Sequence, residues 1–139
     1  MATKVRDIMT GSPTAVSPDL DIVTVARAMR DEDIGAVLVA DSERLHGLVT
    51  DRDLVVRGLA AGGDPTQIKV SSMVSDEPET VRPDDSLDTA VKRMRERAVR
   101  RLPVVDDGQA VGIISLGDLA IERDASSALA QISAARPNT

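Results

Sequence analysis

Two pairs of polar side chains have the type and spacing to bind another polar group. Thr50 stands three residues before Asp53, and Ser115 stands three residues before Asp118. An apolar run precedes each pair and a helical pattern follows it, so both pairs lie where a helix begins. The free amides of a first helical turn favour an anion there. The same spacing also fits a capping box, in which both side chains bond the helix backbone and no ligand is needed.

The two pairs belong to an internal repeat. The matching positions, each 65 residues apart, are Gly47 and Gly112, Thr50 and Ser115, and Asp53 and Asp118. Met9 and Met73 differ by 64, which predicts one residue gained before Pro78. Neither half is long enough to bury much core alone, so we expect the halves to pack together.

The composition is that of a globular chain of one compact domain. Of its 139 residues, 42% are hydrophobic and 29% are charged. Apolar runs fall far short of the ~20 residues that a membrane span needs, and the first residues lack the apolar stretch of a signal peptide. With no cysteine there is neither a disulfide framework nor thiol chemistry. We therefore expect a soluble cytoplasmic protein with no membrane partner.

Charge and residue types argue against several functions. A net charge of −6 and the absence of Phe, Trp and Tyr disfavour nucleic-acid binding, although residues 92–101 hold six basic side chains against Glu96 alone. His46, beside a glycine, is predicted to be a surface residue and not a metal ligand. Asp51, Asp53 and Asp118 have side chains that could hold Mg²⁺ together with nucleotide phosphates, but their spacing is not diagnostic, so we predict no metal site. Nothing matches a catalytic set, so the chain is not expected to be an enzyme.

Each half shows the same order of elements. Helices are predicted after the N-caps Asp21 and Ser86, from apolar positions at helical spacing. Residues 36–40 and 102–105 are continuous apolar runs, and short polar turns lead from them into second strands as antiparallel hairpins. Further helices are expected at 51–57, 116–123 and 126–134, with a loose tail at 136–139.

The predicted fold class is therefore α+β, with two βαββα repeats packed as one pseudo-two-fold module. We place repeat 1 at 5–58, a linker at 59–69, repeat 2 at 70–123 and a C-terminal tail at 124–139.

This arrangement resembles the CBS (cystathionine beta-synthase) domain, and the chain as a whole resembles a free-standing tandem CBS pair. The likeness spans roughly residues 5–121. The residues that carry it are Val81-Arg82-Pro83, Arg101-Leu102-Pro103-Val104-Val105-Asp106, Gly112-Ile113-Ile114-Ser115 with Asp118, and their first-repeat counterparts Val16-Ser17-Pro18, 37–41 and Gly47-Leu48-Val49-Thr50 with Asp53.

The resemblance implies a cleft between the repeats that binds an adenosine-type ligand such as AMP, ADP, ATP or S-adenosylmethionine, with no cofactor required. The family's motif maps onto Thr50 with Asp53 and onto Ser115 with Asp118. There a carboxylate can accept hydrogen bonds from ribose hydroxyls, and the hydroxyl can donate to phosphate.

The other expected ligand contacts also come from the resemblance. Arg100 and Arg101 supply positive charge for phosphate, although both are equally explained as ordinary surface arginines. The base is expected among four aliphatic side chains, which are Val16, Val81, Ile34 and Val99. Because the first repeat has Gly35 and Ala36 in place of the arginines, we expect two unequal clefts.

Two functions remain open. The first is a regulatory or sensor module that binds an adenine nucleotide and acts on an unidentified protein partner. The second is a structural or protein-interaction dimer without a ligand. The resemblance also implies a disc-shaped homodimer, and the apolar faces around Val25, Met29, Val91 and Met94 are the predicted surface for it.

Overall fold

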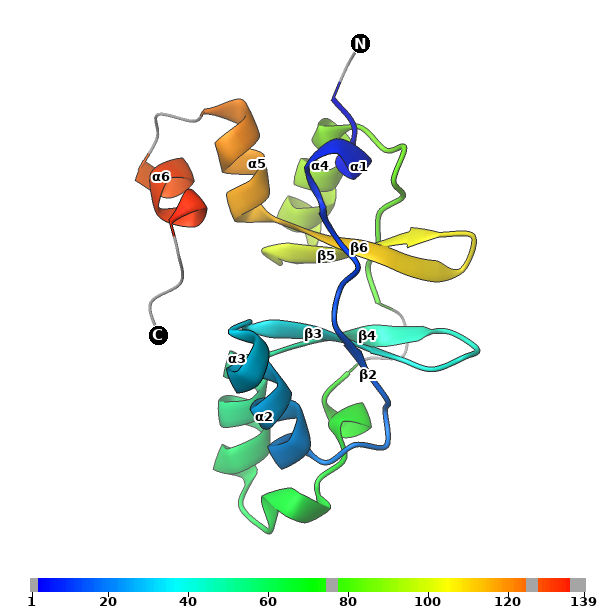
Figure 1. Cartoon of the computed structure of the whole chain (residues 1–139), viewed down its shortest axis with the longest axis vertical. Coiled ribbons are helices and arrows are strands. Elements are labelled where there is room, and N and C mark those ends of the chain that lie inside the picture. Colours follow the sequence, from blue (N-terminus) through cyan, green and yellow to red (C-terminus); the bar gives the residue numbers. More distant parts are fainter. Residues whose placement is uncertain (1–2, 75–77, 125–127, 136–139) are drawn as a thin grey trace. The chain divides into compact units, whose positions relative to one another are not determined.

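The computed structural model of the chain describes residues 3–74, 78–124 and 128–135. These residues form two compact units, each with a three-stranded sheet and its own helices (Figure 1). We call Thr14–Pro78 the first unit, and Met1–Pro13 together with Glu79–Thr139 the second unit. Helices and sheets together in one chain confirm the α+β class. Among the described residues, no helix is both long and apolar enough to cross a membrane.

The first unit is built on a sheet of order β2-β3-β4, in which β2 runs parallel to β3 and β3 antiparallel to β4. Its principal elements are β2 (Ala15–Val16), α2 (Ile22–Glu32), β3 (Ala36–Ala40), β4 (Leu45–Thr50) and α3 (Asp51–Asp53). The predicted helix 51–57 begins as α3 and continues as a π-helical stretch, Leu54–Gly58, and a 3-10 turn, Leu59–Ala61. Two more 3-10 turns follow, at Pro65–Gln67 and Val70–Met73.

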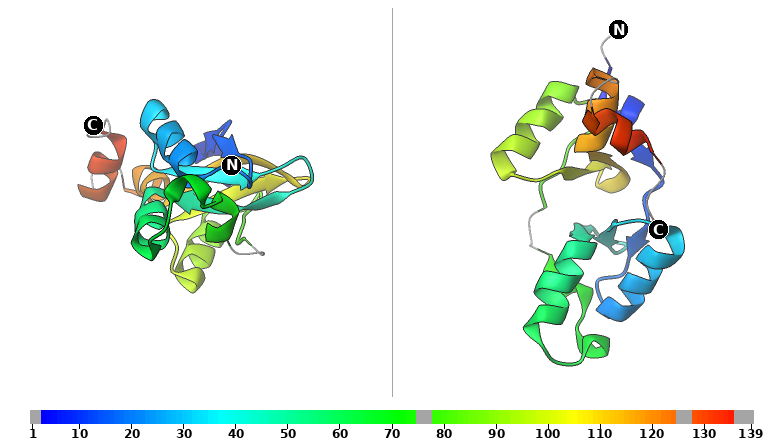
Figure 2. Two further views of the ribbon diagram at one scale, coloured as in Figure 1. Left: turned by 90° about the horizontal axis from the view of Figure 1, so that it is seen from below. Right: turned by 90° about the vertical axis from the view of Figure 1, so that its left-hand side faces the viewer.

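The second unit has a fully antiparallel sheet of order β1-β6-β5. Its elements are α1 (Val5–Ile8), β1 (Thr10–Gly11), α4 (Leu87–Arg97), β5 (Arg101–Asp106), β6 (Gln109–Ser115), α5 (Leu116–Arg123) and α6 (Ala128–Ala134). Val81 forms only an isolated parallel bridge with Val104, where the repeat predicts a strand. The helix α6 lies alongside α5 in Figure 1 and in both views of Figure 2. The predicted tail at 136–139 lies outside the described residues, as do Ser126 and Ser127 of the predicted last helix.

The N-caps predicted for α2 and α4 are confirmed. Asp21 accepts a hydrogen bond from the amide of Thr24 at 3.1 Å, and the hydroxyl of Ser86 accepts one from the amide of Thr89 at 3.2 Å. Each bond satisfies one of the amides that a helix start leaves unpaired.

Both helices also end in the same way. Asp33 after α2 and Ala98 after α4 adopt left-handed backbone conformations, with φ of 55° and 53°. The next amide then turns back onto the last helical turn, because Ile34 N donates to Met29 O and Val99 N to Met94 O, both at 3.0 Å. This local geometry fixes where Ile34 and Val99 leave the helices.

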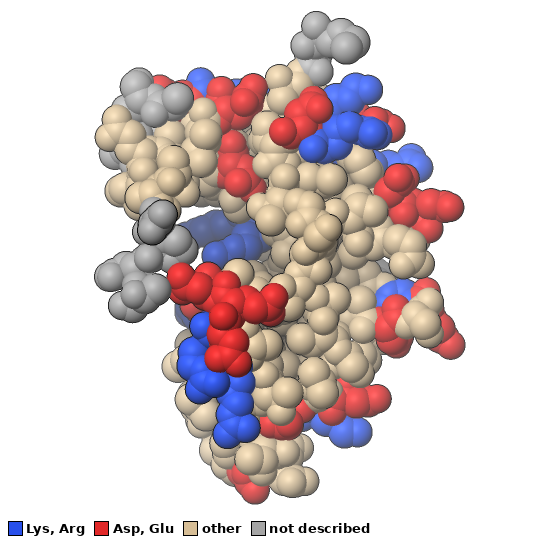
Figure 3. Space-filling view, viewed as in Figure 1, with Lys and Arg blue, Asp and Glu red and all other residues tan. Residues whose placement is uncertain are grey.

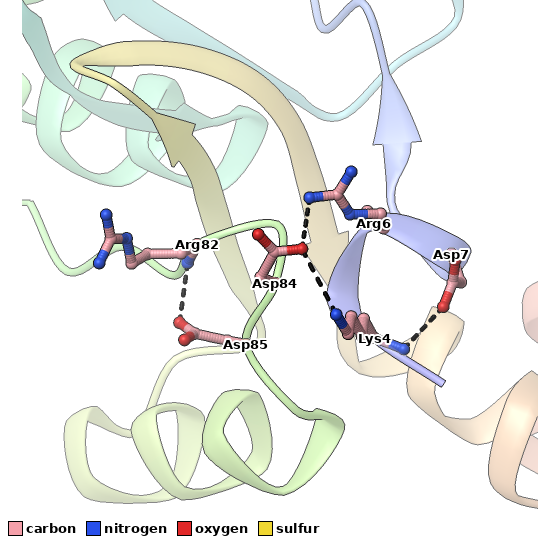
Figure 4. Close-up of polar contacts among 6 residues, drawn as sticks. All are labelled: Lys4, Arg6, Asp7, Arg82, Asp84 and Asp85. Carbon is pink, nitrogen blue, oxygen red and sulfur yellow. Dashed lines mark hydrogen bonds and ion pairs between the residues drawn. The ribbon is translucent and has the colours of Figure 1, made fainter. Parts of the chain in front are cut away.

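The first residues of each repeat pack in the unit that holds most of the other repeat. Val5 is fully buried in the core of the second unit, and its amide donates to Asp85 O at 3.0 Å. Figure 4 shows the neighbouring Lys4 and Arg6 pointing toward Asp84. Val70 is equally buried in the core of the first unit. The boundaries of the sequence repeat therefore differ from those of the compact units.

The spacing of 65 holds through this segment, so the predicted gain of one residue before Pro78 is wrong. The bridge between Lys4 and Ser86 has its counterpart between Lys69 and Asp21, and both partners shift by 65. The prediction was wrong because it paired Met9 with Met73 as equivalent residues. A methionine in one repeat can instead correspond to an isoleucine in the other, since either residue can fill the same core position.

The predicted dimer surface is also wrong, because its side chains are interior. Val25, Met29 and Met94 are at most 6% exposed, and Val91 packs against the core of the second unit. Each helix uses its apolar face to cover its own sheet.

Candidate functional site

The first polar pair forms a capping box at the end of β4. The amide of Asp53 donates to Thr50 Oγ1 at 3.2 Å, and the amide of Thr50 donates to Asp53 Oδ2 at 2.9 Å. Two amides at the start of α3 are thus satisfied by side chains of the chain itself.

The second pair repeats this geometry at the end of β6. The amide of Asp118 donates to Ser115 Oγ at 3.1 Å, and the amide of Ser115 donates to Asp118 Oδ2 at 2.8 Å. In both boxes it is Oδ2 that caps the helix, while Oδ1 has no hydrogen-bond partner within the described part of the chain. A carboxylate oxygen accepts about two hydrogen bonds, so capping leaves each aspartate able to bind a further donor.

The two predicted arginines lie beside the second box. Arg101 is directly opposite Ser115 in the register of β5 and β6, and the carbonyl of Arg100 accepts from the amide of Leu116 at 2.8 Å. Both side chains are exposed, and neither forms an ion pair with a described residue. Unpaired guanidinium groups next to a helix start are suited to a phosphate or carboxylate.

The first unit has the same backbone frame without this charge. Ala36 is opposite Thr50, and Gly35 O accepts from the amide of Asp51 at 2.9 Å. At the strand beside each box, the difference between the two units therefore comes from side chains at two equivalent positions, since the register of the strands is the same.

The four aliphatic residues predicted around a base have different environments. Val16 and Val81 are 8% and 0% exposed, as members of the cores of the first and second units. Ile34 is partly buried against the first core, whereas Val99 is 37% exposed. Of the four, Val99 offers the most side-chain surface, and it shares the second unit with both arginines.

His46 is tied to the hairpin of the first unit. Its Nε2 lies 2.7 Å from Asp41 Oδ2, and the amides of Glu43 and Arg44 donate to Asp41 Oδ1. The His46 hydrogen bond, together with these amides, lowers the pKa of Asp41 to about 2. In the described ranges, no cluster of three or more His, Cys, Asp or Glu side chains could hold a metal ion.

The structure adds one group that the sequence interpretation missed. Ser133 of α6 lies against Gly117, the residue between the two members of the second box, and a Cβ at Gly117 would be 2.6 Å from Ser133 Oγ. A glycine in the first turn of a helix, where it has low propensity, was the available signal.

A cavity of about 630 Å³ opens beside α1 in the second unit, and its lining does not include Ser115 or Asp118. Figure 3 shows basic and acidic side chains mixed beside α1, and Figure 4 shows them in detail. Asp84 pairs with both Lys4 and Arg6, while Thr3 donates to Glu122. These groups satisfy one another, so the cavity offers a ligand little that is unpaired.

Comparisons with known proteins agree with this architecture. The CBS domain family matches residues 5–58 and 70–123. The CBS domain-containing protein YhcV of Bacillus subtilis is 39% identical over 135 residues, which cover 94% of this chain and 96% of YhcV. Hypoxic response protein 1 of Mycobacterium tuberculosis is 39% identical over 119 residues, covering 85% of this chain and 83% of that protein.

Solved structures share the fold. The crystal structure of Hypoxic Response Protein I with two coordinated zinc ions has a TM-score of 0.78 at 38% identity, covering 86% of this chain and 98% of that one. A CBS domain pair in complex with 5′-methylthioadenosine and S-adenosyl-L-methionine has a TM-score of 0.79 at 22% identity, covering 91% and 100%. The chain belongs to the CBS domain family and carries two CBS domains in tandem.

Proposed function

We propose that the chain is a regulatory module that binds an adenosine-type ligand at the start of α5. The observation that carries the proposal is the free Oδ1 of Asp118 in the same corner as the unpaired side chains of Arg100 and Arg101. The carboxylate suits ribose hydroxyls, the guanidinium groups suit phosphate, and the exposed side chain of Val99 suits a base. AMP, ADP, ATP and S-adenosylmethionine all combine an adenosine with a charged group.

Two facts about related proteins support this choice. CBS-pair proteins are generally regulatory and not catalytic. A structure of the same fold was solved with 5′-methylthioadenosine and S-adenosyl-L-methionine, which are both adenosine derivatives.

The test is to compare two matched variants of the nucleotide-free protein. Asp118→Ala and Asp53→Ala each remove one capping carboxylate, at a cost of about 1 kcal/mol in unfolding free energy. Only Asp118→Ala is expected to weaken AMP binding, by about tenfold or more in titration calorimetry. Equal AMP affinity in both variants would show that Asp118 does not bind the ligand.

A structural or protein-interaction module without a ligand is the second candidate. It is favoured by the two capping boxes, which are complete without any bound molecule. Extraction of the purified protein followed by mass spectrometry separates the two functions. Because the chain has no Trp or Tyr, near-ultraviolet absorbance of the intact protein also reports bound nucleotide directly.

We also propose a homodimer, with a surface that differs from the predicted one. Val55, Val56 and Leu59 are 56%, 47% and 59% exposed, and they lie in the π-helical stretch and the 3-10 turn that follow α3 in the first unit. Three large exposed apolar side chains so close together in the chain are typical of a contact between subunits.

A further inference from the structure

The last helix is packed onto α5 at its first turn. A Cβ added to Gly117 would be 2.6 Å from Ser133 Oγ and 2.8 Å from Ser133 Cβ, distances that a real Cβ does not adopt. The close approach of α6 therefore requires glycine at 117. The equivalent residue of the first repeat is Arg52, whose exposed side chain would fill this space.

This contact places α6 at the proposed ligand site. Gly117 lies between Ser115 and Asp118, and the same Cβ position is only 3.6 Å from Ser115 Oγ. Ser133 and Ser115 thus flank one point above the first turn of α5. The amides of Leu116 and Asp118 in that turn already donate to Arg100 O and Ser115 Oγ, so the Ser115 hydroxyl is the group left to donate to a ligand phosphate. That phosphate and the end of α6 would compete for one space.

The C-terminal half of α6 is largely exposed to solvent. Of residues 130–135, only Ala130 is buried, and Ile132 is 73% exposed. The helix has seven residues and no charged side chain. A helix this short is unstable in water by itself, so releasing α6 from α5 also unfolds it. A helix end with so few buried side chains among residues 130–135 opens at low free-energy cost.

We propose that α6 is an autoinhibitory cover, which must leave Gly117 before an adenosine-type ligand can bind Ser115 and Asp118. The proposal rests on the function proposed above. It adds a regulatory step that lies outside both CBS domains, since the family match ends at residue 123.

The experiment uses full-length Gly117→Ala, with AMP as the probe. Alanine favours the helix α5 but clashes with Ser133, so α6 is released while α5 remains folded. Hydrogen exchange should show faster exchange of the amides at 128–134 and unchanged exchange in α5. Calorimetry should show that the variant binds AMP about threefold more tightly or better. The reason is that α6 no longer covers Gly117 in any fraction of the molecules.

Two controls separate the cover from other effects. Gly11→Ala adds the same methyl group to the second unit where nothing lies within 4 Å, and it should change neither measurement. Adding Ser133→Gly to Gly117→Ala removes the clash but keeps the new methyl group, so it should restore both slow exchange and weaker AMP binding.

The outcomes distinguish the cover from the site beneath it. Faster exchange with unchanged or weaker AMP binding would overturn the cover and leave the AMP site standing. Unchanged exchange in Gly117→Ala would overturn it as well. If neither the wild type nor any variant binds AMP, both the proposed function and the regulatory step that depends on it are incorrect.

Discussion

Asp53 and Asp118 each cap a helix through one carboxylate oxygen, and at Asp118 the other oxygen is the one that the proposed function assigns to a ligand. Each uses Oδ2 to cap a helix and keeps Oδ1 free of partners among the described residues. Capping and ligand binding are therefore compatible at the atomic level. What distinguishes the two positions is the neighbouring strand, where Arg101 stands in one unit and Ala36 in the other.

Asp41 gives a prediction of pH dependence at the same scale. The His46 hydrogen bond lowers its pKa to about 2, below the ordinary value of 3.8. A lowered pKa means that the charged form stabilises the fold above the unfolded pKa, and this contribution is lost as pH falls from roughly 5 toward 2. Urea unfolding followed by circular dichroism should show Asp41→Asn less stable than the wild type near neutral pH, with the difference narrowing over that range. A difference that stays constant with pH would contradict it.

At the scale of elements, α2 and α4 begin and end in the same way in the two repeats. The helical stretches that follow the two capping boxes differ, because a further helix covers only one of them. In the second unit α6 covers part of α5, while Val55, Val56 and Leu59 of the first unit remain exposed. The sequences diverge here, because glycine at 117 admits a covering helix and arginine at 52 does not.

The exposed side chains of Val55, Val56 and Leu59 give a test of the proposed homodimer. Leu59→Asp places a charge among apolar side chains, and it should shift sedimentation equilibrium from dimer toward monomer because burying an unpaired charge is costly. Ile132→Asp is the matched control, since that side chain is equally apolar and even more exposed. If both variants or neither dissociate, Leu59 is not at the interface.

At the scale of the whole molecule, the core of each unit is completed by the first residues of the other repeat. Val5 fills the core of the second unit, and Val70 that of the first. The two repeats therefore cannot be separated by cutting the chain at residue 59 without removing part of each core.

The positions of Val5 and Val70 in these cores predict which helices respond to a core mutation. Val5→Ala should cost about 2 kcal/mol of unfolding free energy, with hydrogen exchange increasing first in α4 and α5. Val70→Ala should cost a similar amount but affect α2 first. Should Val5→Ala instead loosen α2, the core assignment of the N-terminal segment is incorrect.

The sequence by itself determined the repeat, its elements, the caps at Asp21 and Ser86, and the pairing of each hydroxyl with its aspartate. These features depend on hydrogen bonds and apolar spacing within a few residues, so local residue types are enough to predict them. Only the tertiary structure decided that Val5 completes the distant unit, that Val16 and Val81 are core, and that α6 lies on Gly117. Such contacts join residues far apart in the chain. Because the hydrophobic effect is not directional, an apolar side chain does not by itself indicate which distant surface it will cover.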